Sequence, residues 1–152
     1  MGSLVSAYDR LTGLLAGRLF ESLALLVTRV ALAGIFWRSG GTKVVEGSWL
    51  EISDTTRFLF ESEYSGLPIP ADIAAPMATF AEHAFPILLV LGLGTRFSAL
   101  ALLGMTLVIQ FFVYPEAWWT VHVVWVALAA ILVSRGGGLF SLDALAARVR
   151  AR

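Results

Sequence analysis

The sequence predicts an all-α integral membrane protein, an antiparallel four-helix bundle formed by a single domain over residues 1–152. Hydrophobic residues make up 58% of the chain and charged residues only 14%, whereas a soluble domain has about 25% charged residues. The apolar residues also gather into four long stretches. A net charge of zero argues against nucleic-acid binding, which needs a basic excess. The absence of cysteine excludes thiol chemistry by this chain alone.

The four apolar stretches predict membrane-spanning helices at about 22–40, 71–93, 97–113 and 117–134. At the rise of an α-helix, about 17 to 20 residues cross the hydrocarbon core of a bilayer. The connections at residues 94–96 and 114–116 are so short that successive helices must run antiparallel. Only the first connection, residues 41–70, has room for structure of its own.

The segment at residues 4–20 predicts an amphipathic N-terminal helix that lies on the membrane. Its leucines and Tyr8 recur at helical spacing, while Asp9, Arg10 and Arg18 lie off this apolar stripe. The charges and glycines interrupt the apolar run, so a cleavable signal peptide does not fit.

Two further short helices are expected outside the spans. In the first connection, Ser53 or Asp54 can cap a helix over residues 55–61, whose apolar side chains favour an interfacial helix that rests on the bilayer or a helix that caps the bundle. An ordinary amphipathic connector is the alternative. Near the C terminus, Ser141 and Asp143 predict a helix start that is followed by a basic tail.

Basic residues predict the orientation of the chain. If the N terminus is cytoplasmic, seven arginines lie on the cytoplasmic side and three basic residues lie opposite, namely Arg38, Lys43 and Arg57. The positive-inside rule then predicts a multi-pass membrane protein with both termini in the cytoplasm. Residues 41–70 become an acidic loop on the outer side of the membrane.

Two charged residues, Arg29 and Glu82, lie inside the predicted spans and are expected to form an intramembrane pair. An unpaired charge at this depth costs at least about 3 kcal/mol, so each should face the bundle and find a partner. Such a pair can simply fix the register of two helices. Alternatively, the carboxylate can accept protons or bind a polar group of a substrate.

Aromatic and polar residues near the outer ends of the helices predict a ligand cavity. Gln110 and His122 lie at similar distances from the turn between the third and fourth spans, so they should face each other. An aromatic cavity with an amide and an imidazole suits a quinone or another amphipathic ring compound, whereas a plain interhelical hydrogen bond is the alternative. With only two histidines, no metal site is expected. The candidate cavity residues are Trp37, Lys43, His83, Gln110, Tyr114, Trp118 and His122.

Four segments of the chain resemble the DoxX family of membrane proteins. They are the run from Arg29 to Lys43, the run from Glu82 to Phe97, the block from Phe112 to Trp125 with Trp118 and His122, and the run from Arg135 to Asp143. The last two segments resemble a subgroup often found beside metal-stress and modified-peptide systems. Trp37 and Arg38 depart from the more apolar pair that is usual in the family.

The resemblance implies a four-helix protein of the bacterial inner membrane. Relatives include a subunit of a thiosulfate:quinone oxidoreductase and membrane parts of oxidative-stress complexes, so the expected role is a subunit or accessory of a redox, quinone-linked or metal-stress system. The alternative is a non-catalytic scaffold or small transporter that recruits a periplasmic partner through the acidic first loop. Beyond the lipid bilayer, the associations considered are a periplasmic or membrane redox partner and a homo-oligomer. Enzymatic activity is left open.

Overall fold

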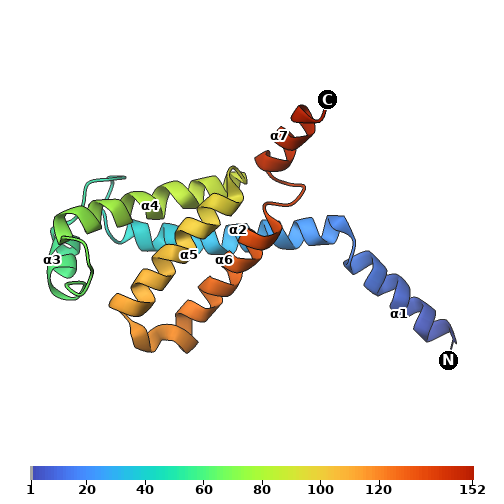
Figure 1. Cartoon of the computed structure of the whole chain (residues 1–152), viewed down its shortest axis with the longest axis horizontal. Helices are drawn as coiled ribbons and strands as arrows, with labels where there is room; N and C mark the ends of the chain where they lie inside the picture. The colour runs from blue at the N-terminus through green and yellow to red at the C-terminus, as the bar shows by residue number, and fades with distance from the viewer. Residues whose placement is uncertain (1) are drawn as a thin grey trace.

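A computed structural model describes residues 2–152, with side chains from Leu4 onward (Figure 1). Helices form nearly all of its regular structure, and one isolated bridge joins Val44 to Ile52. Four helical segments are long and apolar enough to cross a membrane: α2 (Arg18–Gly41), α4 (Ala71–Leu91), α5 (Thr95–Phe112) and Pro115–Arg135, which contains α6 (Val123–Arg135). The predicted all-helical fold with four candidate spans is therefore confirmed.

Helices α2 and α4 form the most extensive contact between any two helices and lie side by side in Figure 1. Gly40 permits their close approach, because a Cβ at this position would lie 2.8 Å from the His83 ring and 3.1 Å from the Glu82 side chain. Further along the pair, the guanidinium of Arg29 lies against Gly92. Residue numbers thus rise along α2 as they fall along α4, and this register determines which polar groups can meet.

The N-terminal region differs from the prediction at one point. Helix α1 (Gly2–Leu15) ends before Gly17, and α2 begins at Arg18 rather than near residue 22. Gly17 has an extended backbone, and its carbonyl accepts the first hydrogen bond of the new helix, from Glu21 N at 3.1 Å. The predicted segment at residues 4–20 therefore divides between two helices. In Figure 1, α1 projects away from the other helices.

The first connection contains the predicted short helix, α3 (Asp54–Ser62), and Ser53 is its cap. The Ser53 hydroxyl accepts a hydrogen bond from Thr56 N at 3.2 Å, which satisfies one of the free N–H groups at the helix start. Phe60 is buried against Ala74 and Ala75 of α4. This packing holds α3 over the first half of α4, where the candidate site lies.

The C-terminal helix α7 (Leu142–Arg150) is bound to the turn between α4 and α5. Each oxygen of the Asp143 carboxylate accepts a 2.8 Å hydrogen bond, one from Gly94 N and one from Thr95 N, and Asp143 N donates to Gly92 O at 2.9 Å. Burial disfavours the charged carboxylate, but these N–H donors and the Arg29 charge outweigh it. They hold the pKa of Asp143 below its usual value.

Because this pKa is lowered in the folded protein, Asp143 should stabilise the fold above pH 4 and lose that contribution in acid. We expect Asp143→Asn to lower the free energy of unfolding by about 1 to 3 kcal/mol near pH 6, since the amide oxygen can accept only one of the two N–H bonds, now as a neutral bond, whereas the amide NH2 group cannot accept the other. The difference in the free energy of unfolding between wild type and the variant should shrink as the pH falls below about 4, the ordinary pKa of an aspartate. Thermal unfolding in detergent from pH 3 to pH 7 measures it, with exposed Asp9→Asn as the control. A gap that stays constant with pH would contradict the assignment.

Candidate functional site

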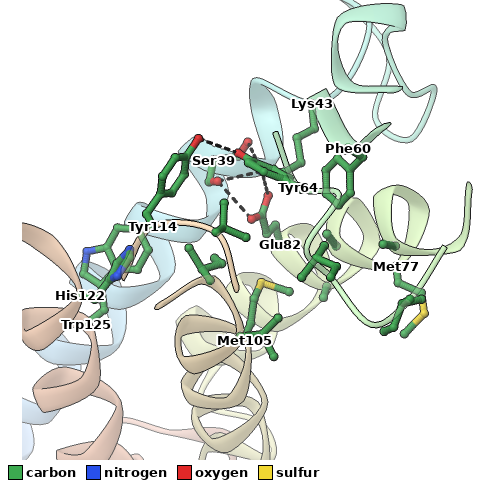
Figure 2. Close-up of a pocket in the computed structure, with 18 of the residues that line it drawn as sticks. Ser39, Lys43, Phe60, Tyr64, Met77, Glu82, Met105, Tyr114, His122 and Trp125 are labelled. Atoms are coloured by element: carbon green, nitrogen blue, oxygen red, sulfur yellow. Dashed lines mark hydrogen bonds and ion pairs between the residues drawn. The ribbon is translucent and has the colours of Figure 1, made fainter. Parts of the chain in front are cut away.

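A cavity of about 450 Å³ lies among helices α3, α4 and α5. The C-terminal end of α2 and the start of the last spanning segment complete its wall. Ligand sites commonly have volumes of about 300 to 1,000 Å³. Most of the wall is apolar, and the labelled side chains in Figure 2 surround the space from several elements. Its polar lining residues are Ser39, Lys43, Tyr64, Glu82, Tyr114 and His122.

One wall of the cavity holds a buried ion pair between Lys43 and Glu82. Lys43 Nζ lies 2.7 Å from Glu82 Oε2, while the Ser39 hydroxyl donates to Glu82 Oε1 at 3.1 Å. Lys43 Nζ also donates to Ser39 Oγ at 3.0 Å, which closes a three-residue cluster (Figure 2). Glu82 is 2% exposed. Its charge is therefore compensated by Lys43 and Ser39 rather than by water.

The predicted pairing of Arg29 with Glu82 is wrong. Arg29 is fully buried, but its guanidinium donates to the backbone oxygen of Phe140, at the other end of the α2–α4 contact. Ser39, which meets Glu82, lies ten residues beyond Arg29, or about 15 Å along the helix. Both charges lie near the middle of their own helices, but the offset between α2 and α4 separates them.

Gln110 and His122 meet across α5 and the last spanning segment, as the sequence predicts. His122 Nδ1 lies 2.7 Å from Gln110 Oε1, and Gln110 Nε2 donates to the Pro115 carbonyl at 2.7 Å. Both side chains are buried, and His122 lines the cavity while Gln110 lies behind it. The ring of Trp125 packs against the imidazole with centroids 5.2 Å apart. The imidazole is thus held from two sides.

A π-helical turn, Trp118–His122, places this histidine. Val123 N bonds back five residues to Trp118 O, so the turn contains one residue more than an α-helical turn. Such turns recur at functional sites. Hydrophobic periodicity gives no signal for a single wide turn, so the sequence predicts one regular helix over the whole segment.

Two tyrosines lie at another part of the cavity wall. The hydroxyl of Tyr64 lies 3.4 Å from that of Tyr114, which donates to Glu63 Oε2 at 3.2 Å. Burial, and secondly the hydrogen bond with Tyr114, raise the pKa of Tyr64 above its ordinary value. Tyr64 was missed because it lies in the first connection, far from the other cavity residues in sequence.

Besides Gln110, three further candidate residues do not line this cavity: Trp37, His83 and Trp118. The Trp37 ring packs edge-on against His83 and Trp49, with centroids 5.1 and 5.8 Å apart. His83 Nδ1 donates to Thr79 O at 2.7 Å. Successive residues on a helix point about 100° apart. Since Glu82 faces the cavity, His83 faces away, and this separation could have been recognised in the sequence.

The arrangement is chemically suited to an amphipathic molecule. Apolar side chains of α4 and α5 can enclose a ring or chain, while polar groups stand at separate points of the wall. In the part of the chain that the structure describes, no three histidine, aspartate or glutamate side chains come together in a group that could hold a metal ion.

Comparison with known proteins gives one family and one similar relative. The family model described as DoxX matches residues 24–115, which include α2, α3, α4 and α5 except for the first residues of α2. A protein of Haemophilus influenzae, named "Uncharacterized protein", is 34% identical over 137 residues, which cover 85% of this chain and 87% of the relative. No solved structure matches the chain significantly.

Proposed function

Because this chain belongs to the DoxX family and is a membrane protein, we propose that it binds a quinone or a similar amphipathic ring compound as a subunit or accessory of a redox-linked or metal-stress system. One observation carries the proposal: an apolar cavity of about 450 Å³ contains a buried Lys43–Glu82 pair on one wall and His122 on another. The apolar wall would enclose the ring and its tail, and the polar groups would orient its oxygens.

In the proposed topology, the four spans form an antiparallel bundle in the inner membrane, with both termini in the cytoplasm. The α2–α4 register supports the antiparallel course, and the arginines support the orientation. Helices α1 and α3 would lie at the two interfaces. Exposed Leu4, Leu11 and Phe58 support this placement.

The orientation can be tested with single cysteines, because the chain has none of its own. In intact spheroplasts, Glu46→Cys should react with a membrane-impermeant maleimide. Arg150→Cys should react only after the membrane is permeabilised. Both positions are exposed, so burial does not confound the comparison. Labelling of Arg150→Cys in intact spheroplasts would contradict the proposed topology.

Ligand binding can be tested by filling the cavity. The protein in nanodiscs is titrated with decylubiquinone while tryptophan fluorescence is recorded, since Trp125 lines the cavity. Ala78→Phe adds a ring to the cavity wall and should weaken binding at least about tenfold. Ala127→Phe makes the same change at an exposed position on α6 and should leave binding unchanged. Equal affinities of the two variants, or no binding by wild type, would refute the proposal.

The acidic first connection supports a second candidate function, recruitment of a basic periplasmic partner by a non-catalytic scaffold. The connection carries two large exposed rings, Trp49 and Phe58. It also carries exposed carboxylates, which belong to Glu46, Glu51, Asp54, Glu61 and Glu63. Deleting the connection would also remove Lys43 and Tyr64 from the cavity, so charge reversal is the cleaner test. Glu46→Lys combined with Glu51→Lys should abolish co-purification of such a partner without changing decylubiquinone affinity. An unchanged partner set would count against the scaffold.

A further inference from the structure

The hydrogen bonds behind His122 determine what this side chain can offer to a ligand. The orientation of the Gln110 amide can be assigned from the Pro115 carbonyl, because a carbonyl oxygen can only accept a hydrogen bond. The Gln110 amide lies 2.7 Å from it, so the amide nitrogen Nε2 must face Pro115. In the opposite orientation, two oxygens would stand 2.7 Å apart with no proton between them. Pro115 therefore determines the orientation of Gln110.

With Gln110 held in this way, its oxygen Oε1 faces the imidazole of His122. The separation from His122 Nδ1 is 2.7 Å, and an amide oxygen can only accept, so Nδ1 must carry the proton. In a neutral imidazole, one ring nitrogen donates and the other accepts. The second nitrogen, Nε2, is then left with a lone pair and no proton.

His122 is on the cavity wall, and in the part of the chain that the structure describes no hydrogen bond reaches its Nε2. No ion pair with His122 is found there either. The ring of Trp125, 5.2 Å away between centroids, packs beside the imidazole and restricts its rotation. A ligand in the cavity therefore meets an acceptor nitrogen whose position and tautomer are already set.

We propose that His122 Nε2 accepts a hydrogen bond from a ring hydroxyl, so that the cavity selects phenolic or quinol-like ligands over ring compounds that carry only carbonyl or ether oxygens. This inference rests on the proposed function, because it assumes that ring compounds enter the cavity. It adds a specificity: of the two redox forms of a quinone, only the reduced form has hydroxyl groups to donate. Gln110 acts as a positioning residue through His122.

The tautomer can be measured on the wild-type protein without any ligand. ¹⁵N NMR of protein labelled at the histidine rings reports which nitrogen carries the proton, and His122→Asn identifies the signal of this residue. We expect a proton on Nδ1 and none on Nε2. In Gln110→Met, the Nδ1 acceptor is lost, so the two tautomers should become mixed. A wild-type ring with its proton on Nε2, or on both nitrogens, would overturn the inference.

Ligand selection can be measured with two probes that differ only in whether the ring oxygen carries a proton or a methyl group. 4-Heptylphenol can donate a hydrogen bond, whereas its methyl ether, 4-heptylanisole, cannot. By calorimetry in nanodiscs, wild type should bind the phenol about tenfold more tightly than the ether, as expected for one hydrogen bond to a buried group. The ratio should fall to about one in His122→Phe and decrease in Gln110→Met. Trp119→Phe changes an exposed ring of the same turn and should keep the wild-type ratio.

The outcomes separate the inference from the proposed function. Equal binding of the two probes by wild type would overturn the inference while leaving a cavity that binds ring compounds. If neither probe nor decylubiquinone bound, both would fail. A preference for the phenol that survived in His122→Phe would also overturn the inference, since another acceptor would then be responsible.

Discussion

Replacing Lys43 by methionine is expected to cost about 3 to 5 kcal/mol of the free energy of unfolding, because it leaves the Glu82 carboxylate buried without its counterion. The two charges are 2.7 Å apart, and the side chains are only 12% and 2% exposed. Methionine keeps most of the apolar stem of lysine, so the loss reports the charge rather than the packing. Removing both charges together, as Lys43→Met with Glu82→Leu, should recover most of this loss.

The chain offers a matched control in its exposed ion pair between Arg135 and Glu21. These groups are 3.1 Å apart, with side chains 68% and 44% exposed. Arg135→Met should therefore cost no more than about 1 kcal/mol. Unfolding in mixed micelles with increasing SDS measures these three variants beside wild type. Equal losses in the free energy of unfolding for Lys43→Met and Arg135→Met would show that Glu82 is not buried against Lys43. The proposed site would then lack its charged wall.

The second large effect is expected from Gly92→Ala, at the end of α4. Gly92 has φ = +67°, a left-handed conformation that an alanine adopts only at a cost of about 1 to 2 kcal/mol. A Cβ here would also lie 2.5 Å from Ser141 Cβ and would overlap the Arg29 guanidinium. The overlap should add about 1 to 3 kcal/mol. The variant should also loosen α7, since Gly92 O accepts from Asp143 N.

Two other glycines separate the contributions to this effect. Gly94 has φ = +57° but open space around its Cβ position, so Gly94→Ala should show the backbone cost alone. Gly104, inside α5, has ordinary φ and open space, so Gly104→Ala should stabilise the protein by about 0.5 to 1 kcal/mol. The measurement is the same SDS unfolding. A Gly92→Ala cost no greater than that of Gly94→Ala would show that Arg29 and Ser141 do not pack against Gly92.

The parts of the fold that follow from local chemistry could be predicted from the sequence. Apolar stretches marked the four spans, and Ser53 and Ser141 marked the starts of α3 and α7, because a hydroxyl that accepts from a nearby N–H is a local interaction. The junction near Gly17 was misplaced. An exposed apolar stripe continues from α1 into α2, so hydrophobicity alone cannot show where one helix ends and the next begins.

The site was predicted less completely, because it depends on how helices are placed relative to one another. Spacing from the turn suggested that Gln110 and His122 should meet, and they do. Of the candidate residues, Lys43, Tyr114 and His122 line the cavity. The partner of Glu82 depends on the offset between α2 and α4, which no local pattern encodes. Met77, Met105 and Tyr64 become part of one wall only after α3 folds over α4 and α5 packs beside it.

Photolabelling of the cavity tests most directly whether a ligand binds there. The protein in nanodiscs is irradiated with a diazirine-bearing alkylphenol, and the modified residues are found by mass spectrometry. We expect labelling at cavity residues that are only partly exposed, such as Met105, Ile109 and Trp125, which excess decylubiquinone should suppress. Labelling confined to exposed side chains such as Phe80, Phe97 and Phe111, with no protection by decylubiquinone, would contradict a ligand site in this cavity.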